Sequence, residues 1–552
     1  MKKITSIVIL LTLVMVRMSA QDVIEIIYNG SEATVNIPSG ISDVERKDKG
    51  GANVTITSET TNKEYIYQVK GTSEDGSLTI NGKYKLTLQL AGLTLTNAHG
   101  GAAIDVECSK RIAVELVNGT INTLSDAPMG NQKAALYIDG HAEFEGGGML
   151  SVAGKLKHAI RAKEYLELKS STGTINVLEA ASDGIHCGKG KVNNEHNYFL
   201  MKGGVVNIFN VGSDGVDSDD YGVIRIEGGT LSVNIKDGDG LKADSTITIN
   251  DGKINISVKG EDSKGIRANY AVNILGGKTN IIVEGNGSKG IKAKRYESGS
   301  TVLQGGELNI SGGELSVQCN GGNLTTGTEV TKCVAVSVDA DLKQTGGDVD
   351  ITVFDEAIAY TLGGETYQGS ETHTGGTFNI RQIPWEFKAN DYEYDMTAYV
   401  TVSNNGERLT NYVDVSIGAF IGDECIGYGI FEEENYGVIR IKCSDTSAQP
   451  VTFKVYCFSD QSEYDLTPSE TVTFQENTYI GEPSNPIVLS YKVRLKGDAN
   501  DDGEVNAEDI VAITNFLSGK VGDVTKENAD VNGDGVVNIA DIVAVSAIIL
   551  GN

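Results

Sequence analysis

Two acidic loops near the C-terminus have the residue types and spacing of calcium-binding loops. They run from Asp498 to Asp509 and, 32 residues further on, from Asp530 to Asp541. Oxygen-bearing side chains at positions 1, 3, 5, 9 and 12, Gly at position 6 and a backbone carbonyl at position 7 suit Ca²⁺. The predicted ligands are Asp498, Asn500, Asp502, Glu504, Asn506, Asp509, Asp530, Asn532, Asp534, Val536, Asn538 and Asp541.

A second set of carboxylates recurs at regular intervals in the first half of the chain. Asp183, Asp214 and Asp239 each precede a Gly and an apolar residue, and Asp217 follows the second of these motifs. Strands that lie about 4.8 Å apart would stack these carboxylates, and like charges at that distance repel. Bound Ca²⁺ would remove the repulsion, so we predict a calcium site on Asp183, Asp214, Asp217 and Asp239. The alternative is that the Asp-Gly pairs only end strands.

Cations take over the same positions in the next two repeats, as Lys264, Arg267, Lys289 and Lys292. This group stands out because the chain has a formal net charge of −29. We predict that these four residues bind an acidic polysaccharide, such as a uronate polymer. The alternative is an ordinary solvated face, on which long cationic side chains cover apolar surface.

A repeat of about 25 residues must position both sets. Each copy contains a short strand, a Gly-Gly or Asp-Gly turn, a second strand, a polar loop and then Gly followed by an apolar residue. That apolar residue falls at Ile104, Leu136, Ile160, Ile185, Val216, Leu241, Ile266 and Ile291, with a looser copy at Ile358. Three short strands per copy, with alternating apolar residues, predict a parallel β-helix over residues 23–384.

The repeat ends near residue 384, and two segments with other patterns follow. Residues 385–490 alternate as short strands and predict a small β-sandwich, which serves as a spacer or an accessory module. Residues 491–552 contain the two acidic loops, each followed by an apolar helix, and predict a small α-helical domain.

The first 20 residues predict a signal peptide, with Lys2 and Lys3, an apolar run and a small residue, Ala20, before the cut. We therefore expect a secreted or cell-surface protein, and no stretch predicts a membrane span. The strong acidity argues against nucleic acid as a partner. The seven cysteines show no metal-binding or disulfide spacing, and we expect most to be buried, with one pair among the last three as an option.

Several segments resemble a secreted family that binds cellulose and polygalacturonate. They are KLTLQLAGLTLTN (85–97), INTLSD (121–126), KAALYIDG (133–140), KHAI (157–160) and DGIH (183–186). The resemblance implies a right-handed parallel β-helix of pectate-lyase type that carries Ca²⁺. It places the family's Asp-Gly positions at Asp183, Asp214 and Asp239, whereas Lys264 and Lys289 depart from the pattern and put a metal there in doubt.

The paired acidic loops resemble a dockerin of the cellulosome type, because each has Asp at position 12 and only one following helix. That resemblance implies a cohesin-type module as partner. Positions 10 and 11 are often Ser-Thr in the family, but they are Ala507-Glu508 and Ile539-Ala540 in this chain. The two halves therefore differ, and symmetric binding in two modes is in doubt.

Three functions are compatible with these patterns. The first is a non-catalytic polysaccharide-binding protein that docks into a polysaccharide-degrading assembly. The second is an enzyme on the same β-helix, either a Ca²⁺-dependent polysaccharide lyase or a glycoside hydrolase. The third is a structural stalk without a ligand. The sequence singles out no catalytic residues, so the binding protein is preferred to the enzyme.

Overall fold

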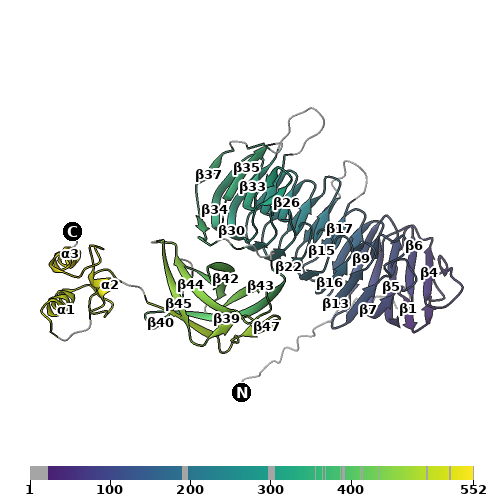
Figure 1. Ribbon diagram of the computed structural model, residues 1–552. Coiled ribbons are helices and arrows are strands. Elements are labelled where there is room, and N and C mark those ends of the chain that lie inside the picture. Colours follow the sequence, from purple (N-terminus) through teal and green to yellow (C-terminus); the bar gives the residue numbers. More distant parts are fainter. Residues whose placement is uncertain are drawn as a thin grey trace, which may run out of the picture. The chain divides into compact units, whose positions relative to one another are not determined.

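The computed structural model describes residues 23–550 apart from several gaps, and the signal peptide predicted at 1–20 lies outside the described residues (Figure 1). The gaps are 189–196, 296–304, 355, 363–364, 367–368, 386, 388–391, 411, 413–414, 434–435, 460, 493–494 and 521–523. The chain forms two compact units, one ending at Gln382 and the other beginning at Ile383.

The first unit contains a 14-stranded sheet that carries the regularly spaced apolar residues. In order, its strands are β3 (Val44–Arg46), β4 (Asn53–Ser58), β6 (Ser77–Gly82), β8 (Ile104–Glu107), β11 (Ala134–Ile138), β14 (His158–Ala162), β17 (Ile185–Cys187), β20 (Val216–Ser218), β23 (Leu241–Ala243), β26 (Lys264–Ala268), β29 (Lys289–Ala293), β33 (Val334–Val338), β35 (Glu356–Leu362) and β36 (Glu365–Thr366). From β4 to β35 the neighbours pair in parallel.

A 22-stranded sheet holds the other two strands of each repeat. Its strands are β1 (Val23–Asn29), β2 (Glu32–Asn36), β5 (Ile66–Ser73), β7 (Leu86–Thr96), β9 (Arg111–Leu116), β10 (Ile121–Ser125), β12 (His141–Glu145), β13 (Met149–Gly154), β15 (Leu166–Leu168), β16 (Thr174–Ala180), β18 (Tyr198–Met201), β19 (Val205–Phe209), β21 (Val223–Ile226), β22 (Thr230–Ile235), β24 (Thr246–Ile249), β25 (Lys253–Val258), β27 (Ala271–Ile274), β28 (Lys278–Val283), β30 (Glu307–Cys319), β34 (Leu342–Val353), β37 (Glu371–His373) and β38 (Thr377–Gln382). A hairpin of β31 (Leu324–Thr326) and β32 (Glu329–Thr331) separates β30 from β33.

The register of the 14-stranded sheet confirms the spacing of the apolar residues. Ile104 pairs with Leu136, Leu136 with Ile160, and the series continues through every predicted position to Ile291. Ile291 then pairs with Val336 and Val336 with Ile358, so Val336 belongs to a copy that the sequence analysis missed. The mostly β composition and the parallel sheets are therefore confirmed.

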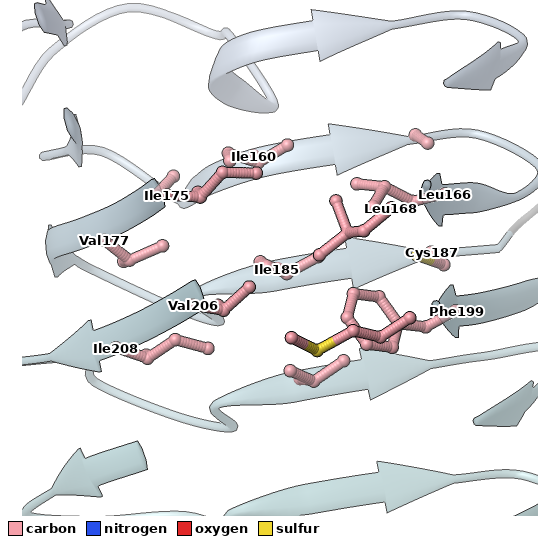
Figure 2. Close-up of a cluster of buried hydrophobic side chains, with 14 of the residues drawn as sticks. Ile160, Leu166, Leu168, Ile175, Val177, Ile185, Cys187, Phe199, Val206 and Ile208 are labelled. Carbon is pink, nitrogen blue, oxygen red and sulfur yellow. The ribbon is translucent and has the colours of Figure 1, made fainter. Parts of the chain in front are cut away.

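The core of this unit consists of apolar side chains stacked from one repeat to the next. Ile160 and Ile185 contribute from the 14-stranded sheet, and Val177, Val206 and Phe199 from the 22-stranded sheet (Figure 2). All five are fully buried. Burying such a side chain contributes about 1.5–3 kcal/mol, so the stack is the main source of stability for the repeat.

Glycines occupy corners where consecutive repeats meet closely. Gly252 has φ +106° and Gly277 has φ +72°, a region that other residues rarely adopt. A Cβ atom on Gly277 would lie 2.5 Å from the carbonyl oxygen of Gly252. Backbone conformation and space therefore both require glycine at this corner.

The second unit begins with a sheet around its own apolar core. The main strands are β39 (Tyr394–Asn404), β41 (Val415–Ile421), β42 (Glu424–Glu433), β43 (Tyr436–Cys443), β44 (Pro450–Cys457), β45 (Ser462–Pro468) and β48 (Ile487–Tyr491), with the short strands β40 (Glu407–Arg408), β46 (Val472–Thr473) and β47 (Thr478–Ile480) beside them. The sequence analysis predicted a small β-sandwich here. The ladders join these strands into one sheet, which closes on itself because β39 also pairs with β48.

Three helices follow: α1 (Ala507–Leu517), α2 (Lys526–Ala529) and α3 (Ile539–Ile549). Asn506 and Asn538 cap the N-termini of α1 and α3. In both helices the side chain of an Asp at the third helical position accepts a hydrogen bond from the backbone N–H of the cap residue. Ile513 and Val545 are fully buried with Ala499 and Ala529 in a small separate core. The two predicted loop–helix units are thus equivalent in structure.

Candidate functional site

The 14-stranded sheet brings the predicted metal and glycan residues into one strip. Each repeat contributes two residues that are three positions apart, and the parallel register places each pair beside the next. The pairs, which we call the charged strip, are His158 and Arg161, Asp183 and His186, Asp214 and Asp217, Asp239 and Lys242, Lys264 and Arg267, and Lys289 and Lys292.

The aspartates at the first position bond to the backbone of the following repeat. Asp183 Oδ1 accepts a hydrogen bond from the N–H of Asp214 at 3.2 Å, and Asp214 Oδ1 accepts one from Asp239 at 2.8 Å. Asp239 Oδ1 accepts a third from the N–H of Lys264 at 2.9 Å. One oxygen of each carboxylate therefore holds neighbouring repeats together.

The second oxygen of two of these aspartates faces a cation from the following repeat. Lys242 Nζ lies 2.9 Å from Asp214 Oδ2, and an Arg267 nitrogen lies 3.4 Å from Asp239 Oδ2. One predicted glycan-binding residue, Arg267, thus contacts one predicted calcium ligand, Asp239. This ladder of alternating charge stabilises the stacking of the strip.

Oxygens of Asp183, Asp214 and Asp217 come within 4.8 Å of one another, as the predicted calcium site requires. Asp239, the fourth predicted ligand, belongs to none of the possible metal-binding groups found among the described residues. Lys242 Nζ lies 2.9 Å from Asp214 and 3.3 Å from Asp217, so an ammonium group supplies positive charge to this site. Burial raises the pKa of Asp214 to about 6 even though Lys242 opposes the shift. Calcium on this strip stays a prediction, and the donor set fits it less well than it fits the C-terminal loops.

The four predicted glycan-binding residues lie on the adjacent strands β26 and β29, where Lys264 pairs in register with Lys289 and Arg267 with Lys292. Lys264 and Lys289 both approach Asp262 Oδ1, at 3.2 and 3.1 Å. Lys292 Nζ lies 2.8 Å from Asp339 Oδ1. The structure therefore gathers these cations, and carboxylates accompany them.

Among the residues that the structure describes, positive charge still exceeds negative charge in this part of the strip. With Lys294, five cations face Asp239, Asp262 and Asp339, which gives 5 − 3 = +2. Burial lowers the pKa of Lys294, and the nearby cations Arg267, Lys292 and Lys264 lower it further. A carboxylate ligand would relieve this crowding of like charge.

The two C-terminal loops have the backbone conformation that their spacing predicts. At position 6, Gly503 and Gly535 have φ values of +93° and +83°. In the first loop Asp498 accepts hydrogen bonds from the N–H groups of Asp502 and Gly503, at 3.0 and 2.9 Å. Asp530 accepts the equivalent bonds from Asp534 and Gly535, at 3.1 and 2.7 Å.

The last position of each loop is a fully buried carboxylate. Asp509 Oδ2 accepts from Asn506 N–H and Asp541 Oδ2 from Asn538 N–H, both at 2.8 Å. An oxygen-only donor set with buried carboxylates fits a hard divalent cation. Both loops therefore fit Ca²⁺, although side-chain contact with an ion stays a prediction.

Comparison with known proteins agrees with these features. Residues 50–357, more than half of the chain, match the model of the family described as "carbohydrate-binding domain-containing protein". The chain belongs to this family. Residues 496–550 match the dockerin type I domain, so the carbohydrate-binding domain is followed by a C-terminal dockerin.

One solved structure is similar to this chain. It is the polysaccharide lyase-like protein from C. thermocellum, solved as a gadolinium derivative. It shares 19% sequence identity, covers 48% of this chain and 94% of its own, and has a TM-score of 0.34. No curated protein matches the chain. In the described part of the chain, no helix is long and apolar enough to cross a membrane.

Sequence reasoning missed the histidines of the charged strip. His158 and His186 stack with ring centroids 4.3 Å apart, and both approach Asp183. The two are 186 − 158 = 28 residues apart, which is not a recognised ligand spacing. The repeat of 25 residues between His158 and Asp183 was the signal that could have placed them together.

Proposed function

We propose that this protein is a secreted, non-catalytic polysaccharide-binding protein that docks into a multiprotein polysaccharide-degrading assembly. One observation carries the proposal: a carbohydrate-binding domain and a dockerin occur in the same chain. The signal peptide predicted at 1–20 belongs to the same proposal, because dockerin partners are expected outside the cell.

The proposed architecture of residues 23–384 is a right-handed parallel β-helix with three strands per coil. Its support is the pairing of every strand from β14 to β27 with the strand three places along the chain. Residues 385–490 would then be a spacer or accessory β-module, and residues 491–552 the dockerin.

The proposed glycan is an acidic polymer of uronate type, and cellulose is the neutral alternative. The cations of β26 and β29 support the acidic glycan, because they lie side by side and outnumber the nearby carboxylates. Lys264, Arg267, Lys289 and Lys292 would contact carboxylates of successive sugars along the strip. Two of them, Lys264 and Lys289, share a single aspartate, Asp262, which leaves charge available for a ligand.

The proposed partner of the dockerin is a cohesin-type module, bound when Ca²⁺ fills both loops. Apolar side chains at the second loop and helix support a surface for a protein partner: Ile539 is 72% exposed, Val543 65% and Leu550 74%. On the first unit, Val511 matches Val543 and is 57% exposed, but Ala507 and Ser518 stand in place of Ile539 and Leu550. We therefore expect α3 to provide most of the apolar contact.

A pull-down on insoluble cellulose and on pectin, with and without a calcium chelator, tests binding directly. Binding to either polymer supports the proposal, and binding to neither would favour a structural stalk. Incubation with polygalacturonate and Ca²⁺, followed by the absorbance of unsaturated product and by a reducing-sugar assay, tests the lyase and hydrolase alternatives. Sustained product formation would contradict the non-catalytic function.

A further inference from the structure

Two buried imidazoles and a carboxylate meet at the start of the charged strip. His158 Nδ1 lies 3.1 Å and His186 Nδ1 lies 2.9 Å from the same oxygen, Asp183 Oδ2. Asp217 Oδ2 lies 3.3 Å from His186 Nδ1. All four residues are at least 95% buried, with exposures of 2, 4, 5 and 3% for His158, Asp183, His186 and Asp217.

These separations, 2.9–3.3 Å, are close to those of atoms that share one metal ion. Zinc-to-nitrogen and zinc-to-oxygen bonds are about 2.0–2.2 Å, so neighbouring ligand atoms of a tetrahedral site lie about 3.3–3.5 Å apart. His158, Asp183 and His186 each offer one ligand atom within 4.8 Å of the others. Asp217 approaches His186 at the same range and would supply a fourth ligand.

Two contacts of His158 Nδ1 make opposite demands on that nitrogen. The backbone N–H of Asp183, at 3.4 Å, would donate to a lone pair on Nδ1. Asp183 Oδ2, at 3.1 Å, is itself an acceptor and needs a cation between it and Nδ1. A proton or a metal ion in that place would join the two atoms and would oppose only the longer N–H contact.

The second ring nitrogen of His186 is placed as it is in metal-bound histidines. Its Nε2 lies 3.6 Å from Asp219 Oδ2 and makes no hydrogen bond among the described residues. A histidine that binds metal through one nitrogen usually directs the N–H of the other toward a carboxylate. Asp219 would orient His186 in this way.

The charges of the neighbourhood also match a divalent ion. Four carboxylates, from Asp183, Asp214, Asp217 and Asp219, surround the two histidines together with Lys242 and Arg161. With neutral imidazoles, the sum over these described residues is 2 − 4 = −2. Excess charge in a buried cluster is unfavourable, and one divalent cation would bring the sum to zero.

We propose that His158, Asp183 and His186, with Asp217 as fourth ligand, bind one divalent transition metal of the zinc class. Nitrogen donors distinguish this site from the oxygen-only calcium loops and favour Zn²⁺ over Ca²⁺. The site uses only protein ligands and joins the consecutive strands β14, β17 and β20. Its role is therefore structural, and it is independent of the proposed glycan binding.

The test uses the full chain, stripped of metal, saturated with Ca²⁺ and then equilibrated with Zn²⁺. We expect elemental analysis to find one zinc per chain, and zinc-edge X-ray absorption to show two imidazole nitrogens with oxygen and no sulfur. His158→Gln and His186→Gln should weaken zinc binding at least tenfold. His99→Gln, which changes a largely exposed histidine paired with Asp75, is the matched control and should bind as the original chain does.

Failure of the original chain to bind zinc would overturn the proposal and would leave a shared proton as the link between the histidines. A zinc coordination shell made only of oxygen, or one that contains sulfur, would also overturn the proposal. So would zinc binding of unchanged affinity by a His186→Gln variant that folds. If a variant does not fold, the absorption spectrum of the original chain decides alone.

Discussion

At the scale of single residues, the strip shows how paired charges become part of a repeat. Asp214 and Asp239 each bond to the next repeat through one oxygen and to a cation through the other. The sequence analysis identified these positions from the spacing alone. It could not show that the acidic and basic columns lie within contact distance, because that depends on side-chain direction and not on register.

Lys242 is the residue on which the acidic half of the strip depends. Lys242→Met would leave Asp214 without the cation that lies 2.9 Å from it, and an uncompensated buried charge costs about 3–5 kcal/mol. Because Lys242 is partly exposed, we expect a loss of about 2–4 kcal/mol in the free energy of unfolding by denaturant titration. Lys253→Met, on an exposed lysine of β25, is the control and should change it by less than about 0.5 kcal/mol. Equal effects of the two substitutions would contradict the claim that the ladder of alternating charge stabilises the strip.

Asp105 on β8 predicts a dependence of stability on pH. Burial, and then the negative charge of Glu107, raises the pKa of Asp105 to about 7 in the folded chain. The folded state therefore binds this proton more tightly than the unfolded state, and the contribution to stability is lost as the pH rises from about 4 to about 7. Asp105→Asn should be close to neutral at pH 4 and stabilising by about 1–3 kcal/mol at pH 8.

Thermal unfolding of the Asp105→Asn variant at several pH values provides the measurement. Asp251→Asn, at an exposed turn, serves as the control. A stability difference that does not change between pH 4 and pH 8 would show that Asp105 titrates normally.

At the scale of elements, the glycine corners set the spacing of the repeats. Gly277→Ala would place a Cβ atom 2.5 Å from the Gly252 carbonyl oxygen at φ +72°. Strained backbone of this kind costs about 1–3 kcal/mol, and the close contact adds to it. We expect a clear fall in the midpoint of thermal unfolding. Gly327→Ala is the control, because Gly327 has a similar φ of +64° but a Cβ atom there would meet no atom within 4 Å. A fall of the same size in this variant would show that backbone conformation alone causes the effect.

The calcium loops and their helices predict a second element-scale result. Asp498 and Asp509 are at most 1% exposed, and in the described structure the groups that bond to their side-chain oxygens are N–H donors. Ca²⁺ should therefore raise the midpoint of thermal unfolding of the C-terminal domain, by mass action. Asp498→Asn combined with Asp530→Asn should remove most of that increase. If a chelator does not change the midpoint of thermal unfolding, the prediction that both loops bind Ca²⁺ is contradicted.

Most of the repeat could be predicted because apolar residues at near-constant spacing determine the register. The copy at Val336 was missed because 336 − 291 = 45 residues separate it from Ile291, and the β31–β32 hairpin lies within that stretch. In residues 385–490 the alternation predicted strands correctly. It could not predict that β39 also pairs with β48 and closes the sheet, since that contact joins strands far apart in the sequence.

At the scale of the whole molecule, the net charge of −29 is unevenly distributed along the chain. Residues 491–552 carry 5 − 11 = −6, largely in the two loops proposed to bind Ca²⁺. The strip carries excess negative charge around His158 and His186, and excess positive charge on β26 and β29. Within the described part of the strip, the positive end is therefore where we propose that a polyanion is attracted.

Calorimetric titration of the full chain with polygalacturonate tests the central claim most directly, with the Lys264→Gln, Lys289→Gln double variant beside the original chain. Loss of two partly screened ion pairs corresponds to about 1–2 kcal/mol, so we predict affinity about 5–30-fold weaker in the variant. Lys83→Gln, an exposed lysine on the β6–β7 connection, should bind as the original chain does. Equal affinity for the original chain and the double variant, with both folded, would contradict the account.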